Sequence, residues 1–397
     1  MSGNIAQELT ETFASASEFV QPPPGLTERV RSGVRRRRRR ALAATAIATA
    51  VLLGAAATGY AAAGSHGTAA RLQAPTARSR VIGTVSYQVT QLAVSGRYLY
   101  VAAGQNSWVS AYDVVTGKLI ATVTVPGEPV ALAVRPGGLV WVGYSPSGSA
   151  GPGGVWLLSP DLGQHSELTG LSADSIVPVS RTTALVPSRH GLLRVRLPLP
   201  GQPGQGSQRA EPGTSLGPGA TTAPGAWSGM LGNRVTVQVS TGAGDNSRLV
   251  VAGQPGLTYG GSARTHINGA TSTGSAVWVS TFAQINGESS LQGPLVRLNA
   301  ALTPTTPPAV LTSPVLSRSE DVWSDGRTLW VATGVLTHSL VCLAAGSRTG
   351  PVVTLPVSGQ VVALAAAGST VYVNALEPPG STAPSKIVSY PVPAACQ

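Results

Sequence analysis

A short apolar motif recurs seven times along the chain, and each copy places a Tyr, a Trp or a smaller stand-in between two apolar residues. The copies are Leu99-Tyr100-Val101, Val140-Trp141-Val142, Ala184-Leu185-Val186, Val235-Thr236-Val237, Val277-Trp278-Val279, Leu329-Trp330-Val331 and Val371-Tyr372-Val373. Their centres lie 41 to 52 residues apart, and no helical periodicity separates them. A period of this length is typical of a β-propeller, in which each repeat is one blade of four antiparallel strands.

The two ends of the repeated region complement each other. Residues 81–86 resemble residues 119–124, which read as the fourth strand of a blade, yet they precede the first blade. The last blade, from Val362 to Pro391, is one strand short. We therefore predict that the first strand completes the last blade, which removes two open sheet edges. The expected fold is all-β: a single closed seven-bladed propeller over residues 80–395, with six or eight blades as the alternatives.

The repeat resembles a known type. Residues 119–142 read LIATVTVPGEPVALAVRPGGLVWV and resemble the repeat of YVTN-type propellers, a group similar to the surface-layer, lactonase-like and quinoprotein-like propellers. The resemblance covers the whole expected ring and is closest in blades one and two. Because that superfamily contains both enzymes and binding proteins, the resemblance implies a fold and a repeat type but no activity.

The formal charge of +11 is divided unevenly. Residues 1–40 hold eight Arg against four acids, and six of those Arg form an unbroken run at 35–40. The remaining basic residues are scattered, with no patch in which they alternate with aromatic side chains. Proteins that read nucleic acid concentrate their basic residues in such a patch, so we expect no nucleic-acid partner.

An uncharged, Ala-rich segment, residues 41–63, follows the Arg run directly. As a helix it would cover about 34 Å, enough to cross a hydrocarbon core of about 30 Å. The positive-inside rule keeps the Arg run in the cytoplasm. We expect a cytoplasmic tail (1–40), a transmembrane signal anchor (41–63), a linker (64–79) and a propeller outside the cell, as in a single-pass protein of the cell membrane. The alternative is a cleaved signal peptide, with small residues at 61–63 beside the cleavage point.

The tail itself offers a second feature. Ile5, Leu9 and Phe13 recur every four residues, which places them on one face of a short helix that ends before Pro22. One interpretation is a docking helix for a cytoplasmic partner of residues 1–33, and the other is a solvated tail.

The chain has two cysteines, Cys342 and Cys396, both on the expected outer side. An oxidising compartment permits a disulfide, which would attach the C-terminus to the neighbouring blade. The alternative is two independent thiols, and spacing alone does not decide between them.

Residues 198–225 consist largely of Pro, Gly, Ser, Thr and Ala. Such a composition cannot bury a core, so this stretch is predicted to be a surface insertion loop.

Local motifs for chemistry are sparse. The five His residues show no metal-ligand spacing with one another or with Cys, so no metal site is predicted. The Gly213-x-Ser215-x-Gly217 match lies in the Pro/Gly-rich stretch without the strand-to-helix turn that a nucleophile needs. We predict no catalytic residues and no cofactor.

A propeller offers instead its central mouth, lined by residues at the starts of the innermost strands. Aligning the blades places candidate ligand-binding residues there: Gln91, Asp174, His266, Asn268, Glu320, Asp321 and Gln360. The acidic and imidazole groups are suited to a cation or polar ligand, or to acid–base chemistry. The alternative is an ordinary solvated rim.

The leading interpretation is a membrane-anchored extracytoplasmic propeller that serves as a non-enzymatic binding or scaffolding module for a protein or small ligand. One alternative is an extracytoplasmic propeller enzyme, a lactonase-like hydrolase or a quinone-dependent oxidoreductase, acting at the central mouth. Another is a transmembrane sensor that signals through its cytoplasmic tail.

Overall fold

The computed structural model describes the repeated region with short gaps. The described ranges are 79–85, 89–104, 106–135, 137–146, 153–188, 191–202, 208–216, 220–221, 227–241, 247–260, 265–285, 288–305, 319–333, 339–345, 352–357, 359–376 and 384–397. The expected tail, membrane helix and nearly all of the linker lie outside these ranges. Within the ranges, no helix has the length and apolar character that a membrane crossing requires.

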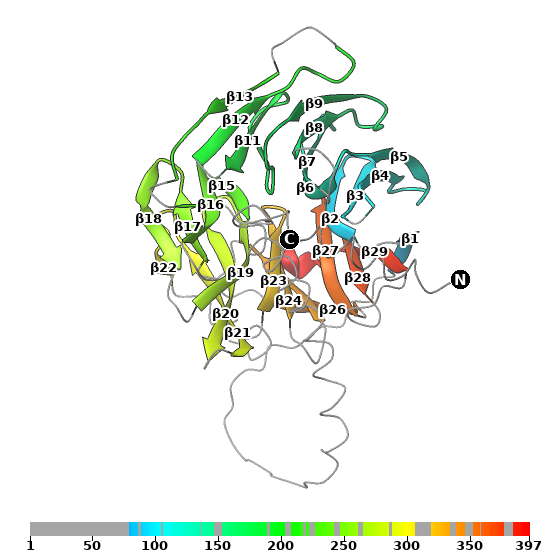
Figure 1. The fold of residues 1–397 in the computed structure, drawn as a ribbon. Coiled ribbons are helices and arrows are strands. Elements are labelled where there is room, and N and C mark those ends of the chain that lie inside the picture. The colour runs from blue at the N-terminus through cyan, green and yellow to red at the C-terminus, as the bar shows by residue number, and fades with distance from the viewer. Residues whose placement is uncertain are drawn as a thin grey trace, which may run out of the picture. The chain divides into compact units, whose positions relative to one another are not determined.

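Seven antiparallel sheets form the ring (Figure 1). Blade one has β2 (Val89–Ser95), β3 (Tyr98–Ala103), β4 (Trp108–Asp113) and β5 (Leu119–Thr124); blade two has β6 (Glu128–Val134), β7 (Val140–Ser145), β8 (Gly154–Leu158) and β9 (His165–Thr169); blade three has β10 (Val177–Pro178), β11 (Thr183–Ser188), β12 (Gly191–Arg196) and β13 (Arg209–Pro212). Blade four has β14 (Ala220–Thr221), β15 (Ser228–Leu231), β16 (Arg234–Thr241), β17 (Ser247–Val251) and β18 (Gln254–Gly260); blade five has β19 (Thr265–Ser272), β20 (Val277–Ile285), β21 (Glu288–Leu298) and β22 (Pro304–Thr305). Blade six has β23 (Ser319–Ser324), β24 (Thr328–Thr333), β25 (Ser339–Ala344) and β26 (Val353–Leu355); blade seven has β27 (Gln360–Ala367), β28 (Thr370–Leu376), β29 (Ser385–Pro391) and β1 (Arg80–Val85), and the short helix η3 (Ala394–Cys396) follows. The all-β, seven-bladed prediction is confirmed.

The ring closes where the two ends of the repeated region meet. β1 pairs with β29 from Arg80 opposite Ser389 to Val85 opposite Ser385, so the first strand is the outermost strand of the last blade. Figure 1 shows β1 beside β29. The predicted closure is confirmed, and main-chain hydrogen bonds hold this seam.

The recurrent motif occupies the second strand of each blade and fills the spaces between blades. Tyr100 clusters with Val140 and Val142 of blade two. Trp330 likewise clusters with Val371 and Val373 of blade seven. The central side chain therefore packs on the next blade and the flanking pair on the previous one, as the alternation of a strand requires. Among the described residues there are seven buried apolar clusters, one for each interface between blades.

Blade four departs from this plan. Its central residue is Thr236, which is fully buried and whose hydroxyl has no hydrogen-bond partner in the structure. Its inner edge is also divided, because β14 and β15 both pair with β16.

The Pro/Gly-rich stretch 198–225 contributes to the ring, which corrects its prediction as a surface insertion. β13 lies within it and supplies the outer strand of blade three, and β14 supplies part of blade four. Leu216, which is 2% exposed, belongs to the cluster between these blades. The composition led to a wrong prediction because an outer strand is held by main-chain pairing and needs few apolar side chains. An edge strand also tolerates a proline at its end, here Pro212.

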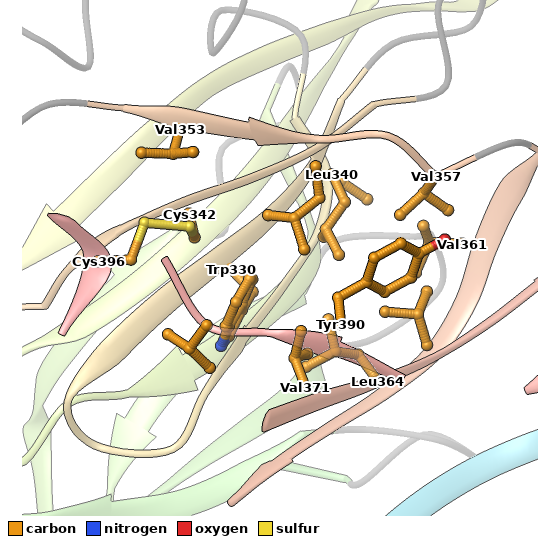
Figure 2. Packing of buried hydrophobic residues seen from close by; sticks show 14 residues of the cluster. Trp330, Leu340, Cys342, Val353, Val357, Val361, Leu364, Val371, Tyr390 and Cys396 are labelled. Atoms are coloured by element: carbon orange, nitrogen blue, oxygen red, sulfur yellow. A yellow bond between two sulfur atoms is a disulfide. The ribbon is translucent and has the colours of Figure 1, made fainter. Parts of the chain in front are cut away.

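Cys342 and Cys396 form a disulfide with a Cα–Cα distance of 5.7 Å. Cys342 lies on β25 of blade six and Cys396 in η3, after the last strand of blade seven. The Thr328 hydroxyl donates a hydrogen bond of 2.9 Å to the Cys396 carbonyl beside it. Figure 2 shows the disulfide together with Trp330, Val353 and Tyr390 of the same buried cluster. The bond therefore spans the interface between blades six and seven.

Candidate functional site: the mouth of the propeller

The innermost strands form a continuous inner wall. β2, β6, β10, β15, β19, β23 and β27 each approach the next one around the ring, and β27 approaches β2. We call the face where these strands begin the mouth face. We call the opposite face, where each blade makes its first hairpin turn, the turn face. Paired strands within a blade run in opposite directions, so each strand has one end at the mouth face and the other at the turn face.

The candidate residues lie on or beside inner strands of five blades. Gln91 is on β2, His266 and Asn268 are on β19, Glu320 and Asp321 are on β23, Gln360 opens β27, and Asp174 precedes β10. Gln91 and Asn268 are exposed, and Asp321 and Gln360 are half-buried. The side chains of His266 and Glu320 lie outside what the structure describes.

A repeated irregularity shapes the wall at this level. The register of the inner strand shifts by one residue at Thr90, Val130, Asn268, Glu320 and Val362, in five of the seven blades. Such β-bulges leave one residue out of the ladder and redirect its neighbours. Two of the candidates, Asn268 and Glu320, occupy bulge positions, and Gln91 and Asp321 follow one directly. The residue left out of the ladder is polar in blades one, five and six (Thr90, Asn268 and Glu320) and is a valine in blades two and seven.

Asp174 is used within the structure. Its side chain is 8% exposed. The Ser145 hydroxyl donates to Oδ1 and the Ser172 hydroxyl to Oδ2, each at 3.1 Å. Because Ser145 ends β7, this carboxylate connects blade two to blade three. With both oxygens occupied, Asp174 is better suited to holding two blades together than to binding a ligand.

Asp321 sits against the neighbouring blade. A Cβ added to Gly269 of β19 would lie 2.2 Å from Asp321 Oδ1, so the carboxylate fills the space above this glycine. The same Oδ1 accepts a 2.9 Å hydrogen bond from the Val322 N–H. Asn268 directly precedes Gly269 in β19. Asn268 and Asp321 both make further interactions within the protein.

Glu128, which we did not select from the sequence, opens β6 and also contacts the preceding blade. A Cβ on Gly104 would lie 2.7 Å from Glu128 Oε1 and equally close to Thr90 Cγ2. The Thr90 hydroxyl in turn lies 3.1 Å from the Pro129 carbonyl. The inner-strand register makes Val130 equivalent to Thr90 and Glu320, so Glu128 lies two residues before the position at which the other candidates were chosen. The available signal was an acid at or near the start of an inner strand, as in blades three and six.

The mouth therefore carries carboxylates from blades two, three and six, each contacting the preceding blade. Within the described ranges, His, Cys, Asp and Glu nowhere gather in a group of three that could hold a metal ion. The described arrangement is suited to binding a polar or cationic group through separate hydrogen bonds around the rim.

No family model and no curated protein matches the sequence. Solved structures do match. The WD40 domain of Neurospora crassa Pan2 is similar with a TM-score of 0.55 and 9% identity, covering 80% of this chain and 97% of that one. Kuenenia stuttgartiensis hydrazine synthase is similar with a TM-score of 0.54 and 13% identity, and the match covers 77% of this chain and 96% of that one. The β-propeller domain of Cps50 (Swd1) from Myceliophteria thermophila has a TM-score of 0.50 and 13% identity, and the match covers 80% of this chain and 100% of that one. At these identities the likeness establishes the propeller fold alone.

Proposed function

We propose that the chain is a single-pass, membrane-anchored extracytoplasmic propeller with YVTN-type repeats, which binds or scaffolds a partner at its mouth without catalysis. The observation that carries the proposal is the convergence of polar side chains from different blades at the mouth face: Gln91, Glu128, Asn268, Asp321 and Gln360. A ring of separate hydrogen-bonding groups favours a polar or basic ligand. A propeller is well suited to this use because its repeats hold the binding groups rigidly.

The location outside the cell is supported by two features. The sequence places an Arg run directly before an uncharged segment of 23 residues. The structure contains a disulfide, and structural disulfides are typical of oxidising compartments. Alkaline carbonate extraction of membranes and protease treatment of intact cells test this part. We expect the full chain to stay with the membrane, and the ring to be accessible from outside.

Site-specific photo-crosslinking in cells tests the mouth. A crosslinker at Gln91 or Gln360 should give an adduct with a partner. The matched control is a crosslinker at Thr169, which is exposed at the same face on the outer strand of blade two. We expect no adduct from this position. Equal adducts at the inner and outer positions, or none at either, would contradict binding at the mouth.

The enzymatic alternative makes a different prediction. If the mouth turned over a lactone, or an alcohol with an added quinone, then Glu128→Gln and Asp321→Asn would abolish a measurable rate. We expect no such rate in the unaltered chain.

A further inference from the structure

The turn face is basic. Arginines occupy the first hairpin turn, or the residue beside it, in five of the seven blades: Arg97, Arg135, Arg181, Arg234 and Arg327. Arg80 and Lys118 add two cations at the same face, where β1 meets the turn between β4 and β5. Arg181 and Arg327 are exposed. Cations therefore stand around most of this face.

The acids of the turn face are bound to their own turns. Among the described residues these acids are Asp113, Asp161 and Asp325. The N–H groups of Thr116 and Val115 and the Arg97 guanidinium all bind the Asp113 carboxylate, and they lower its pKa. Asp325 Oδ1 accepts from the N–H groups of Arg327 and Thr328 at 2.8 and 2.7 Å. The three acids stay ionised, but the seven cations named above outnumber them, so the face has a net positive charge.

The same face carries the exposed apolar side chains. Six large apolar residues are exposed among the described ones, and five of them lie at this end of their strands: Val81, Val115, Leu119, Ile120 and Val179. Val115 is 64% and Leu119 55% exposed. Four of the five gather at the contact between β1 and blade one, where the Arg80 guanidinium donates a 2.6 Å hydrogen bond to the Val115 carbonyl. Trp108, the sixth, lies at the mouth-face end of β4.

The chain enters the ring at this face as well. β1 is antiparallel to β29, so Arg80 lies at the turn face and Val85 at the mouth face. The expected anchor ends at Ala63. Seventeen residue steps separate it from Arg80, a span of at most about 60 Å. An anchored chain therefore holds this face, with its cations and apolar side chains, within reach of the bilayer.

We propose that the turn face docks on the anionic surface of the bilayer, with its arginines on lipid phosphates and the apolar group around Val115 and Ile120 in the headgroup region. Interfacial binding combines these two features: buried apolar area and attraction to anionic lipid. A soluble polyanion would use the cations but leave the apolar side chains exposed. Docking this way directs the acidic mouth away from the membrane, toward a partner. The inference rests on the proposed membrane anchoring.

The test uses the full chain in vesicles of phosphatidylglycerol and phosphatidylcholine. An environment-sensitive dye is attached to a cysteine in V115C and, as the matched control, in T169C at the mouth face; the native cysteines are paired and buried. We expect lipids with a quencher near the headgroup to quench the dye at 115 and not at 169. Replacing phosphatidylglycerol by phosphatidylcholine should reduce the quenching at 115.

Charge variants sharpen the test. Each cation near an anionic surface is expected to favour docking by about fivefold, so Arg181→Gln with Arg327→Gln should lower the ratio of docked to undocked ring about 25-fold. Lys386→Gln, which removes an exposed cation on the mouth-face half of β29, should leave it unchanged.

The two proposals fail separately. A chain that resists carbonate extraction but shows equal quenching at 115 and 169 overturns docking and leaves the anchor standing. A chain that carbonate extracts, but whose dye at 115 is still quenched by anionic vesicles, contradicts the anchor and supports docking. Quenching at 169 alone would mean that the mouth faces the lipid, which overturns the inference.

Discussion

Two interfaces in the ring are built from the same repeat and are held very differently. Between blades six and seven, Trp330 is fully buried, Tyr390 packs in the same cluster, and the Cys342–Cys396 disulfide crosses the junction. Between blades four and five, the equivalent central position is Thr236, whose buried hydroxyl, like the Trp330 indole N–H, has no hydrogen-bond partner. A buried aromatic ring removes about 150–250 Å² from water, and a threonine removes far less.

The contrast shows at which interfaces a closed ring tolerates weaker packing between blades. Each blade touches only its neighbours, so stability is distributed over seven separate interfaces. The junction between blades six and seven is the one that the disulfide crosses, and it adjoins the blade in which both ends of the repeated region are paired. Blade four is closed on both sides by other blades, so a weaker interface there opens a smaller part of the molecule.

Removing the aromatic ring at the strong interface should have the largest effect. Trp330→Ala should lower the free energy of unfolding by about 3–5 kcal/mol, because it deletes a fully buried side chain. Urea unfolding measures the loss. Thr236→Ala should cost much less, and Trp108→Ala, at a site 37% exposed, serves as a control for loss of an indole. Equal losses at positions 330 and 236 would refute the contrast.

Removing the disulfide should have the next largest effect. Replacing Cys342 and Cys396 together by Ala opens a loop of 54 residues and should cost about 2–4 kcal/mol. Both sulfurs belong to fully buried residues, so mild reductant on the folded protein should change little. Hydrogen exchange should speed up more in β25 and β29 than in β16. An equal increase in all three strands would contradict a local role.

Repairing the weak interface should give a smaller gain. Thr236→Val removes the unpaired buried hydroxyl at nearly constant shape and should stabilise the protein by about 1 kcal/mol. The matched control is Thr328→Val, which removes a buried hydroxyl that is hydrogen-bonded to the Cys396 carbonyl. That variant should destabilise, so the two substitutions are expected to have opposite signs in the same unfolding assay.

Alkaline pH should produce the smallest difference. Burial raises the pKa of Tyr259, which packs against the cluster between blades four and five. Because the pKa is higher in the folded state, neutral Tyr259 contributes fully to the free energy of unfolding below the ordinary tyrosine pKa of about 10. This contribution is lost as the pH rises through the folded-state pKa. Ionisation of Tyr259 should therefore destabilise the interface between blades four and five above about pH 10. Tyr259→Phe should flatten this dependence, and unchanged pH profiles would contradict the assignment.

The number of blades and the closure could be read from the sequence because both depend on a pattern that repeats. The centre of each motif must pack on the next blade, which keeps the apolar triplets recognisable even where Trp becomes Leu185. Blade-three strand β13 was missed because its residues, Arg209–Pro212, carry no apolar signal and are defined only by pairing with β12.

The mouth could be predicted only to the level of which strands surround it. Glu128 was missed because it lies two residues before Val130, the position of blade two that corresponds to Thr90 and Glu320. The bulges at Thr90 and Asn268 arise from pairing geometry, which leaves no mark in composition. Ser145 donates a hydrogen bond to Asp174 from 29 positions away in the chain. Such a contact can be predicted only when the positions of the two blades relative to each other are known.

The seam also has a consequence for timing. The Ser389 hydroxyl bonds the Arg80 carbonyl across 309 positions of the chain, so the first strand of the ring to be synthesised is among the last to be paired. At about 5–20 residues per second, β1 waits roughly 15–60 s for β29. During that interval its main-chain groups are open to pairing with other strands, including those of neighbouring nascent chains. The rate at which the last blade is completed therefore sets how long a growing chain stays prone to aggregation.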